Sequence, residues 1–229
     1  MSDTLLINAC VRPESRTKML ADYLIEKLGA SVEEVNLEKE SLIPLTWDLL
    51  QQREAALAER TDGTSAKTNK ADFEADNIAE MAREKSSSET DSGDESTFVA
   101  AQNQDILKYA KQFAEAERIV IAAPHWDLSF PASLKTYVEY ICAIGVTFDY
   151  NEQGQPFGLC NAKELWFVTT AGGPILSDEP GFGYIQALCQ RFFGIPKLHY
   201  IKAEGLDIVG ADVEEILAEA RRRIDGSVE

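Results

Sequence analysis

Four short runs of mainly apolar residues and one weakly alternating segment, residues 31–37, recur along the chain, separated by segments whose apolar residues fall three or four positions apart. Short apolar runs with little alternation are typical of strands that are buried on both faces, as in a parallel sheet. The predicted strands are residues 4–9, 31–37, 118–124, 164–170 and 197–203. The third of these, RIVIAAP, is the strongest because its centre is β-branched and unbroken.

The segments between these runs predict amphipathic helices. In the first of them, Leu20, Leu24 and Leu28 share one helical face, and Gly29 supplies the stop. Further helices are predicted at 47–60, 131–144, 184–195 and 213–224, and a long helix carries Val99, Ile106, Ala110 and Phe113 and ends near Glu117. Residues 146–158 alternate around a turn, which predicts a small β-hairpin.

Strands that alternate with helices predict one α/β domain over residues 1–229, with a doubly wound five-stranded parallel sheet between two helical layers. Residues 61–97 break this pattern because they are polar, acidic and rich in serine. We interpret them as a partly mobile, solvated insertion. Within it, residues 72–85 could form a helix through Phe73, Ile78 and Met81.

The charge balance excludes several partners. The chain has 39 acidic and 22 basic residues, for a net charge of −17. Binding to a nucleic-acid backbone needs a cationic surface, so nucleic acid is disfavoured, and anionic membranes would be repelled. No apolar stretch reaches transmembrane length and no signal sequence is visible, so a cytoplasmic location is expected. Four scattered cysteines and two histidines predict no metal site.

Ligands of open parallel sheets bind at the carboxyl ends of the strands, which selects loops 10–17, 124–130 and 170–183. In the first loop, Ser15 and Thr17 can cap the following helix, whose free N–H groups make an anion site, and Arg12 and Arg16 add positive charge. A capped helix with two solvated arginines is an equally good interpretation of this loop alone. Neither GxxxxGK[ST] nor GxGxxG occurs, which disfavours nucleotide-triphosphate chemistry and a dinucleotide fingerprint.

The other two loops predict a slot for a flat ligand. Pro124, His125 and Trp126 leave the third strand, although Trp126 and Phe130 could instead pack under the next helix. The fourth strand ends in TTAGGP, whose glycines allow backbone N–H groups to approach a ligand. No GxSxG motif supports a serine hydrolase. A phosphate pocket beside such a slot suits FMN.

Three stretches resemble the family of FMN-dependent NAD(P)H:quinone oxidoreductases and azoreductases, which are flavodoxin-like proteins. They are LLINACVRPESRTKMLADYL, IVIAAPHWDLSFPASLKTYVEYICAIGVTFDYNEQGQPFGL and FVTTAGGPI. The resemblance implies a flavodoxin-like three-layer αβα fold, bound FMN and a homodimer with active sites at the subunit interface. Two motifs differ from the azoreductase pattern: HWDL stands in place of MYNF, and TAGG in place of SRGG. Azo dyes are therefore not assumed as substrates.

The resemblance also implies roles for individual residues. Those implied to hold FMN are Ser15, Arg16, Thr17, Pro124, His125, Trp126, Asp127, Leu128, Thr170, Ala171, Gly172 and Gly173. Arg12 joins this set because of its positive charge in the first loop. We expect Trp126, Phe130, Phe148 and Tyr184 to form the walls of the acceptor site. His125 either donates a proton or hydrogen bond to the reduced acceptor or only frames the pocket, and both interpretations stay open.

The expected reaction is transfer of a hydride from NADH or NADPH through flavin N5 to a quinone or a similar small acceptor. Two alternatives stay open. One is a flavodoxin-type FMN electron carrier that serves a protein partner, and the other is an α/β scaffold domain with an empty pocket.

Overall fold

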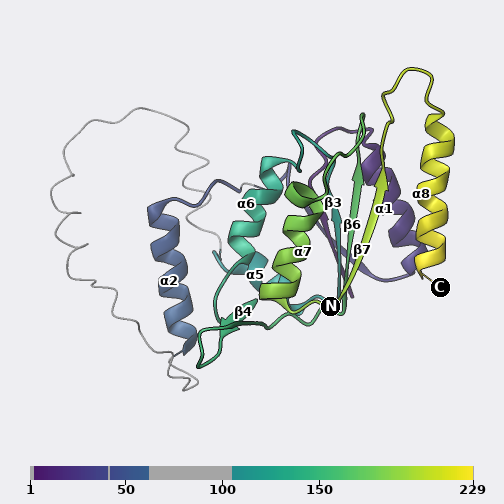
Figure 1. Ribbon diagram of the computed structural model, residues 1–229. Coiled ribbons are helices and arrows are strands. Elements are labelled where there is room, and N and C mark those ends of the chain that lie inside the picture. Colours follow the sequence, from purple (N-terminus) through teal and green to yellow (C-terminus); the bar gives the residue numbers. More distant parts are fainter. Residues whose placement is uncertain (1–2, 41, 62–104, 229) are drawn as a thin grey trace, which may run out of the picture.

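The computed structural model describes residues 3–40, 42–61 and 105–228 (Figure 1). Its main sheet is parallel throughout, with the order β2-β1-β3-β6-β7. The five strands are β1 (Thr4–Asn8), β2 (Val32–Asn36), β3 (Arg118–Ala122), β6 (Glu164–Thr170) and β7 (Lys197–Ala203). All five predicted strands are confirmed, and the doubly wound order places the switch point between β1 and β3.

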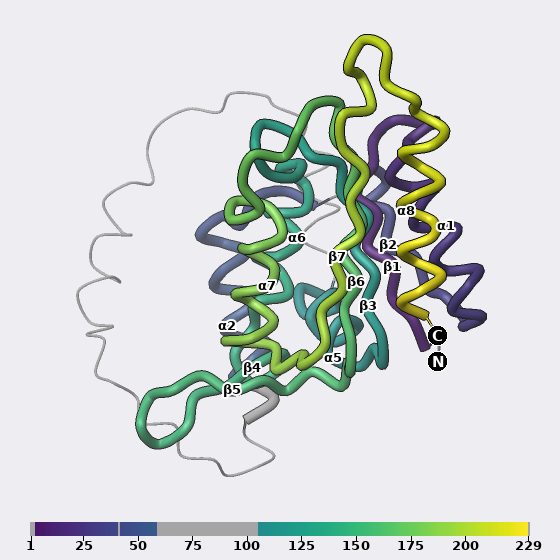
Figure 2. The backbone as a smooth tube through the Cα atoms, turned by 45° about the vertical axis from the view of Figure 1, so that its right-hand side comes forward, coloured from purple at the N-terminus to yellow at the C-terminus, as the bar shows by residue number. Residues whose placement is uncertain are grey.

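Helices cover both faces of this sheet, as Figures 1 and 2 show. One layer contains α1 (Arg16–Leu28) and α8 (Val213–Val228), and the other contains α2 (Trp47–Thr61), α5 (Lys108–Glu115), α6 (Ala132–Ile141) and α7 (Tyr184–Leu188). Alternate strand residues feed separate cores: Leu5 and Ile7 face the α5–α6–α7 layer, whereas Leu6 faces α1 and α8. The three-layer αβα arrangement is therefore confirmed.

Two predicted helices differ from the structure at their ends. The segment 184–195 is regular only in α7, which lies between two π-helical segments, η1 (Glu179–Gly183) and η2 (Cys189–Phe193). These wide turns close through N–H groups of Gly183 and Gly194, which donate to the carbonyls of Asp178 and Cys189. The helix that ends near residue 117 is shorter than its pattern predicts, since α5 covers only Lys108–Glu115 of the described residues.

The predicted hairpin is confirmed as β4 (Phe148–Tyr150) and β5 (Pro156–Gly158), an antiparallel pair that packs against η2. The preceding helix α6 ends at Ile141 because the Thr147 hydroxyl donates to the Ile141 carbonyl, 2.6 Å away. The predicted helix at 72–85 and the predicted insertion after residue 61 lie outside the described residues.

A charged cluster lies at the amino ends of β3, β6 and β7. Glu164 accepts from Arg118 Nε at 2.6 Å and lies 3.0 Å from His199 Nε2. The His199 ring stacks on Trp166 with centroids 3.6 Å apart. Burial lowers the pKa of His199 more than its contact with Glu164 raises it. Burial would raise the pKa of Glu164, but hydrogen bonds from Arg118 and His199 outweigh this and lower it.

Both shifts predict a loss of stability in acid. The folded state favours the neutral form of His199 and the ionised form of Glu164. Each group therefore contributes stability that is lost as the pH falls, below about 6.5 for His199 and below about 4.5 for Glu164. In urea unfolding measured from pH 7 to pH 4, we expect the wild type to lose stability more steeply than the His199→Gln variant between pH 6.5 and 5. Parallel curves for the two proteins would contradict this role of His199.

Candidate functional site

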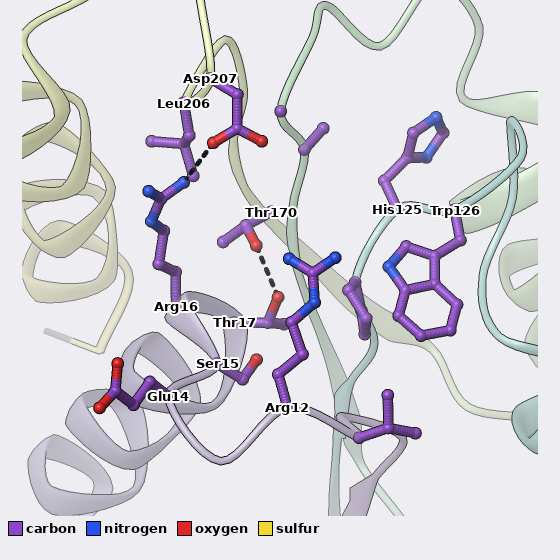
Figure 3. A pocket seen from close by; sticks show the side chains of 14 residues that line it. Arg12, Glu14, Ser15, Arg16, Thr17, His125, Trp126, Thr170, Leu206 and Asp207 are labelled. Atoms are coloured by element: carbon purple, nitrogen blue, oxygen red, sulfur yellow. Dashed lines mark hydrogen bonds and ion pairs between the residues drawn. The ribbon is translucent and has the colours of Figure 1, made fainter.

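A pocket of about 330 Å³ lies at the carboxyl ends of the parallel strands (Figure 3). It is formed by the loops that follow β1, β3, β6 and β7. The lining residues are Val11, Arg12, Glu14, Ser15, Arg16, Thr17, Pro124, His125, Trp126, Thr170, Ala171, Gly172, Leu206 and Asp207. The sheet-edge rule therefore located the pocket correctly, because three of its four loops are those selected from the sequence.

The amino end of α1 forms one side of the pocket. Ser15 has the extended backbone of an N-cap, and its Oγ accepts from the Lys18 N–H at 3.3 Å. The first N–H groups of a helix have no partner within the helix and carry partial positive charge, which favours an anion. The guanidinium of Arg12 projects into the same space in Figure 3. This side of the pocket therefore has the donors that a phosphate group needs.

Two buried hydroxyls join this side of the pocket to the sheet. Thr17 Oγ1 and Thr170 Oγ1 lie 2.7 Å apart and share a hydrogen bond, in which either can be the donor. Thr17 is fully buried and Thr170 nearly so. This bond links the first turn of α1 to the carboxyl end of β6 and so fixes two walls of the pocket relative to each other.

The β3–α6 loop supplies the opposite wall. The His125 N–H donates to the Thr170 carbonyl at 2.9 Å, which fixes the start of the loop against β6. Trp126 and Ser129 then exchange two backbone hydrogen bonds of 3.1 and 2.7 Å around a tight two-residue turn. The turn residues Asp127 and Leu128 have φ values of 49° and 67°. Such values characterise a type I′ turn and strain any residue with a Cβ, so this turn is held by its surroundings.

Ten of the residues predicted to hold a cofactor line the pocket together. Asp127, Leu128 and Gly173 do not line it, because the first two turn outward at the tip of the tight turn and Gly173 is exposed. The side chains of Asp127 and Leu128 are exposed as well. Their contribution to the site is the shape of the backbone between His125 and Ser129.

The four residues predicted to form the walls of the acceptor site do not lie together in this subunit. Trp126 lines the pocket, but Phe130 and Tyr184 pack against each other outside its lining, with ring centroids 5.9 Å apart. Phe148 needs correction, because it is buried beside the carboxyl end of η2, where it stacks on Phe192 at 4.5 Å. The β4–β5 hairpin carries Phe148 away from the carboxyl edge of the sheet.

The β7–α8 loop was missed in the sequence. Leu206 is buried beneath the pocket, and the Asp207 carboxylate reaches Arg16 Nη1 at 2.9 Å. Val11 and Glu14 also line the pocket without having been predicted. A signal for the β7 loop was present, since 197–203 was a predicted strand and the sheet-edge rule applies equally to the residues that follow it.

Cys10 lies at the start of the first pocket loop and is buried. Burial raises the pKa of Cys10, which keeps the thiol protonated beside the first loop. Within residues 3–40, 42–61 and 105–228, no three His, Cys, Asp or Glu side chains gather as metal ligands would. In the same ranges, none of the helices has the length and apolar character needed to span a bilayer.

The fold and pocket define an α/β protein with a pocket at the carboxyl ends of a doubly wound parallel sheet. The chain belongs to the flavodoxin-like fold family, whose model matches residues 2–228.

Individual relatives carry more specific names. An FMN-dependent NADH:quinone oxidoreductase from Clostridium acetobutylicum is 49% identical over 117 residues, which cover 49% of this chain and 58% of that protein. A protein of the same description from Clostridium perfringens is 42% identical over 121 residues, or 52% and 60% of the two chains. The chain thus spans less than two thirds of these curated relatives.

The crystal structure of an azoreductase from Bacillus anthracis matches 100% of this chain and 99% of its own, with 23% identity and a TM-score of 0.69. At that identity the likeness concerns the fold.

Proposed function

We propose that this protein is an FMN-dependent oxidoreductase that passes electrons from NADH or NADPH to a quinone or a similar small acceptor. The observation that carries the proposal is the pocket itself, in which a helix amino end, two arginines and two buried hydroxyls lie beside Trp126 and Gly172. The names of the clostridial relatives support the same activity, and they favour NADH as the reductant.

The residues present fit FMN. The α1 amino end, with Ser15, Arg16, Thr17 and Arg12, would hold the phosphate because it offers N–H, hydroxyl and guanidinium donors. The backbone from Pro124 to Trp126 and the segment from Thr170 to Gly173 would hold the flat ring system. When bound, FMN supplies a centre that accepts a hydride and passes electrons on, so the chain needs neither a nucleophile nor a metal for the proposed reaction.

The chain's own groups would orient the reactants and stabilise charge. Ala171 and Gly172 line the pocket, but the Ala171 N–H donates to the Ala203 carbonyl and is not directed at a ligand. The Gly172 N–H is therefore the better candidate donor to negative charge that develops on a bound ring. Trp126 contributes an apolar surface that limits water on the opposite side of the pocket.

His125 is the candidate proton or hydrogen-bond donor to the reduced acceptor. Its backbone is fixed by the bond to Thr170, and its half-buried ring lines the pocket (Figure 3). We expect His125→Ala to lower quinone turnover about 10- to 100-fold, because the reduced acceptor would lose its proton or hydrogen-bond donor. Steady-state rates from pH 5.5 to 8.5 test this, with His125→Gln as a variant of closer size. Unchanged turnover across that range would limit His125 to shaping the pocket.

The activity is tested by steady-state oxidation of NADH and of NADPH with a soluble benzoquinone, using protein reconstituted with FMN. The proposal predicts turnover with at least one nucleotide, with NADH preferred. Tight FMN binding without turnover of either nucleotide would contradict the proposed enzyme activity and favour the function of a flavodoxin-type electron carrier. If the protein bound no measurable FMN, the remaining alternative would be a scaffold domain.

We further propose that the chain functions as one domain, in the cytoplasm, and as a homodimer. Apolar side chains exposed around the β4–β5 hairpin support the dimer, because Ile144, Tyr150 and Phe157 would be protected by a second copy. Light scattering during size-exclusion chromatography should give twice the chain mass of 25.4 kDa. A monomer mass at micromolar concentration would contradict this assembly.

A further inference from the structure

Asp207 places a negative charge beside the anion site. Its Oδ1 lies 2.9 Å from Arg16 Nη1, and the two side chains face each other at the rim of the pocket (Figure 3). Arg12 and Arg16 are the two basic side chains that line this pocket, and Glu14 and Asp207 are its two acidic ones. The pairing therefore occupies one of the two cations that an anionic ligand would use.

The position of this carboxylate is set by the backbone. The N–H groups of Gly205, Leu206 and Asp207 donate to the carbonyls of Gly173, Ala171 and Gly172 at 3.0, 3.2 and 2.9 Å. These bonds tie the loop after β7 to the loop after β6, just beyond the ends of the two paired strands. The side chain of Leu206, only 3% exposed, fastens the same loop to the core.

Gly172 makes room for the carboxylate. A Cβ at position 172 would lie 2.3 Å from Asp207 Oδ2 and 3.1 Å from its Cγ, so a side chain there would force Asp207 to move. The glycine was expected to allow close approach of a ligand, and the structure shows that it also allows close approach of Asp207. Two separate features, the loop bonds and the glycine, thus hold a negative charge at this site.

A carboxylate in this place competes with a phosphate for the same guanidinium. An incoming phosphate must share Arg16 or displace Asp207, and it is repelled by the remaining negative charge. A ligand without a phosphate neither needs Arg16 nor is repelled by the Asp207 carboxylate. The effect falls with ionic strength because both side chains are largely exposed.

We propose that Asp207 is a specificity-determining residue that weakens binding of the phosphate end of the ligand by competing for Arg16. Free phosphate is then held too weakly to block the site, whereas FMN gains additional contacts through its ring. The inference rests on the proposed function for the identity of the phosphate-bearing ligand.

The test uses the full-length chain stripped of flavin, with FMN, riboflavin and inorganic phosphate as separate probes. Flavin binding is followed by fluorescence quenching and phosphate binding by calorimetry. At low salt, Asp207→Asn should tighten FMN and phosphate binding about 3- to 10-fold and change riboflavin binding less than either. Asp207→Ala should act in the same direction, and thermal melting shows that each variant is folded.

Two further variants isolate the cause. Asp225→Asn removes the same charge from an exposed ion pair with Lys27 and should change no affinity. In an Arg16→Gln background, Asp207→Asn should increase the affinity for FMN and phosphate by a smaller factor, because there is no guanidinium to release. An equal increase in affinity in that background would contradict competition for Arg16.

The results separate this inference from the proposed function. Unchanged or weaker FMN binding by Asp207→Asn would overturn the role of Asp207, even in a protein that binds FMN and turns over quinone. Tighter phosphate binding by Asp207→Asn, together with no FMN binding by any variant, would support the role of Asp207 and overturn the proposed function.

Discussion

Replacing Ser15 with aspartate is expected to weaken FMN binding at least about 100-fold and to leave riboflavin binding nearly unchanged. Ser15 caps α1 through its Oγ and lines the pocket, so a carboxylate there would face the phosphate directly. A carboxylate and a phosphate dianion within a few ångströms repel each other by several kcal/mol even at a moderate effective dielectric. Aspartate is as good an N-cap as serine, so α1 should still form.

Ser15→Asn is the matched control. Asparagine caps helices as well as aspartate does and has nearly the same shape, but it is neutral. We expect it to bind FMN within about 10-fold of the wild type, since it adds bulk but no charge. Fluorescence titrations at fixed salt give the dissociation constants of FMN and riboflavin for the wild type and both variants. Equal affinities of Ser15→Asp and Ser15→Asn for FMN would show that the phosphate does not bind at the amino end of α1.

Gly158→Ala is expected to give the largest loss of stability. Gly158 ends β5 and packs directly on the backbone at the end of η2, so an added Cβ would lie 2.2 Å from the Phe193 carbonyl carbon and 2.3 Å from the Gly194 nitrogen. Backbone atoms cannot rotate away as a side-chain end can. Overpacking of this kind costs about 3 kcal/mol, at the upper end of the usual range, and we expect at least that decrease in the free energy of unfolding.

Gly226→Ala is the control for this substitution. Gly226 lies in the last turns of α8, where an added Cβ meets nothing within 4 Å. Alanine should therefore be neutral or stabilise the protein by up to about 1 kcal/mol. Urea unfolding monitored by circular dichroism measures both variants. A Gly158→Ala protein as stable as Gly226→Ala would mean that the hairpin is not packed against η2.

The sheet was predictable because its central strands β1, β3 and β6 are apolar on both faces, whereas the edge strand β2 buries only Val35. Leu5, Leu6 and Ile7 in succession can be buried only where helices cover both sides of the strand. Helix α1 followed from its period and its stop at Gly29, and α8 from its period. The π-helical turns around α7 did not, because they depend on contacts such as Gly194 against Gly158, which join distant parts of the chain.

The site was predictable as a set of loops but not in detail. Topology brings Thr17 and Thr170 together, although 153 positions separate them, and the sheet-edge rule captures this. The turn at Asp127 and Leu128 has no glycine or asparagine, so its positive φ values left no signal in the sequence. Asp207 was missed because its loop has no distinctive motif, and Phe148 was misplaced because an aromatic residue after a helix serves a core as readily as a pocket.

The most direct test of the central claim is an anaerobic titration of the FMN-reconstituted protein, monitored through the visible absorbance of the flavin. NADH should bleach the bound flavin, and a stoichiometric amount of benzoquinone should then restore the oxidised spectrum. A flavin that stays oxidised with both NADH and NADPH, or that is bleached but not reoxidised by the quinone, would contradict it.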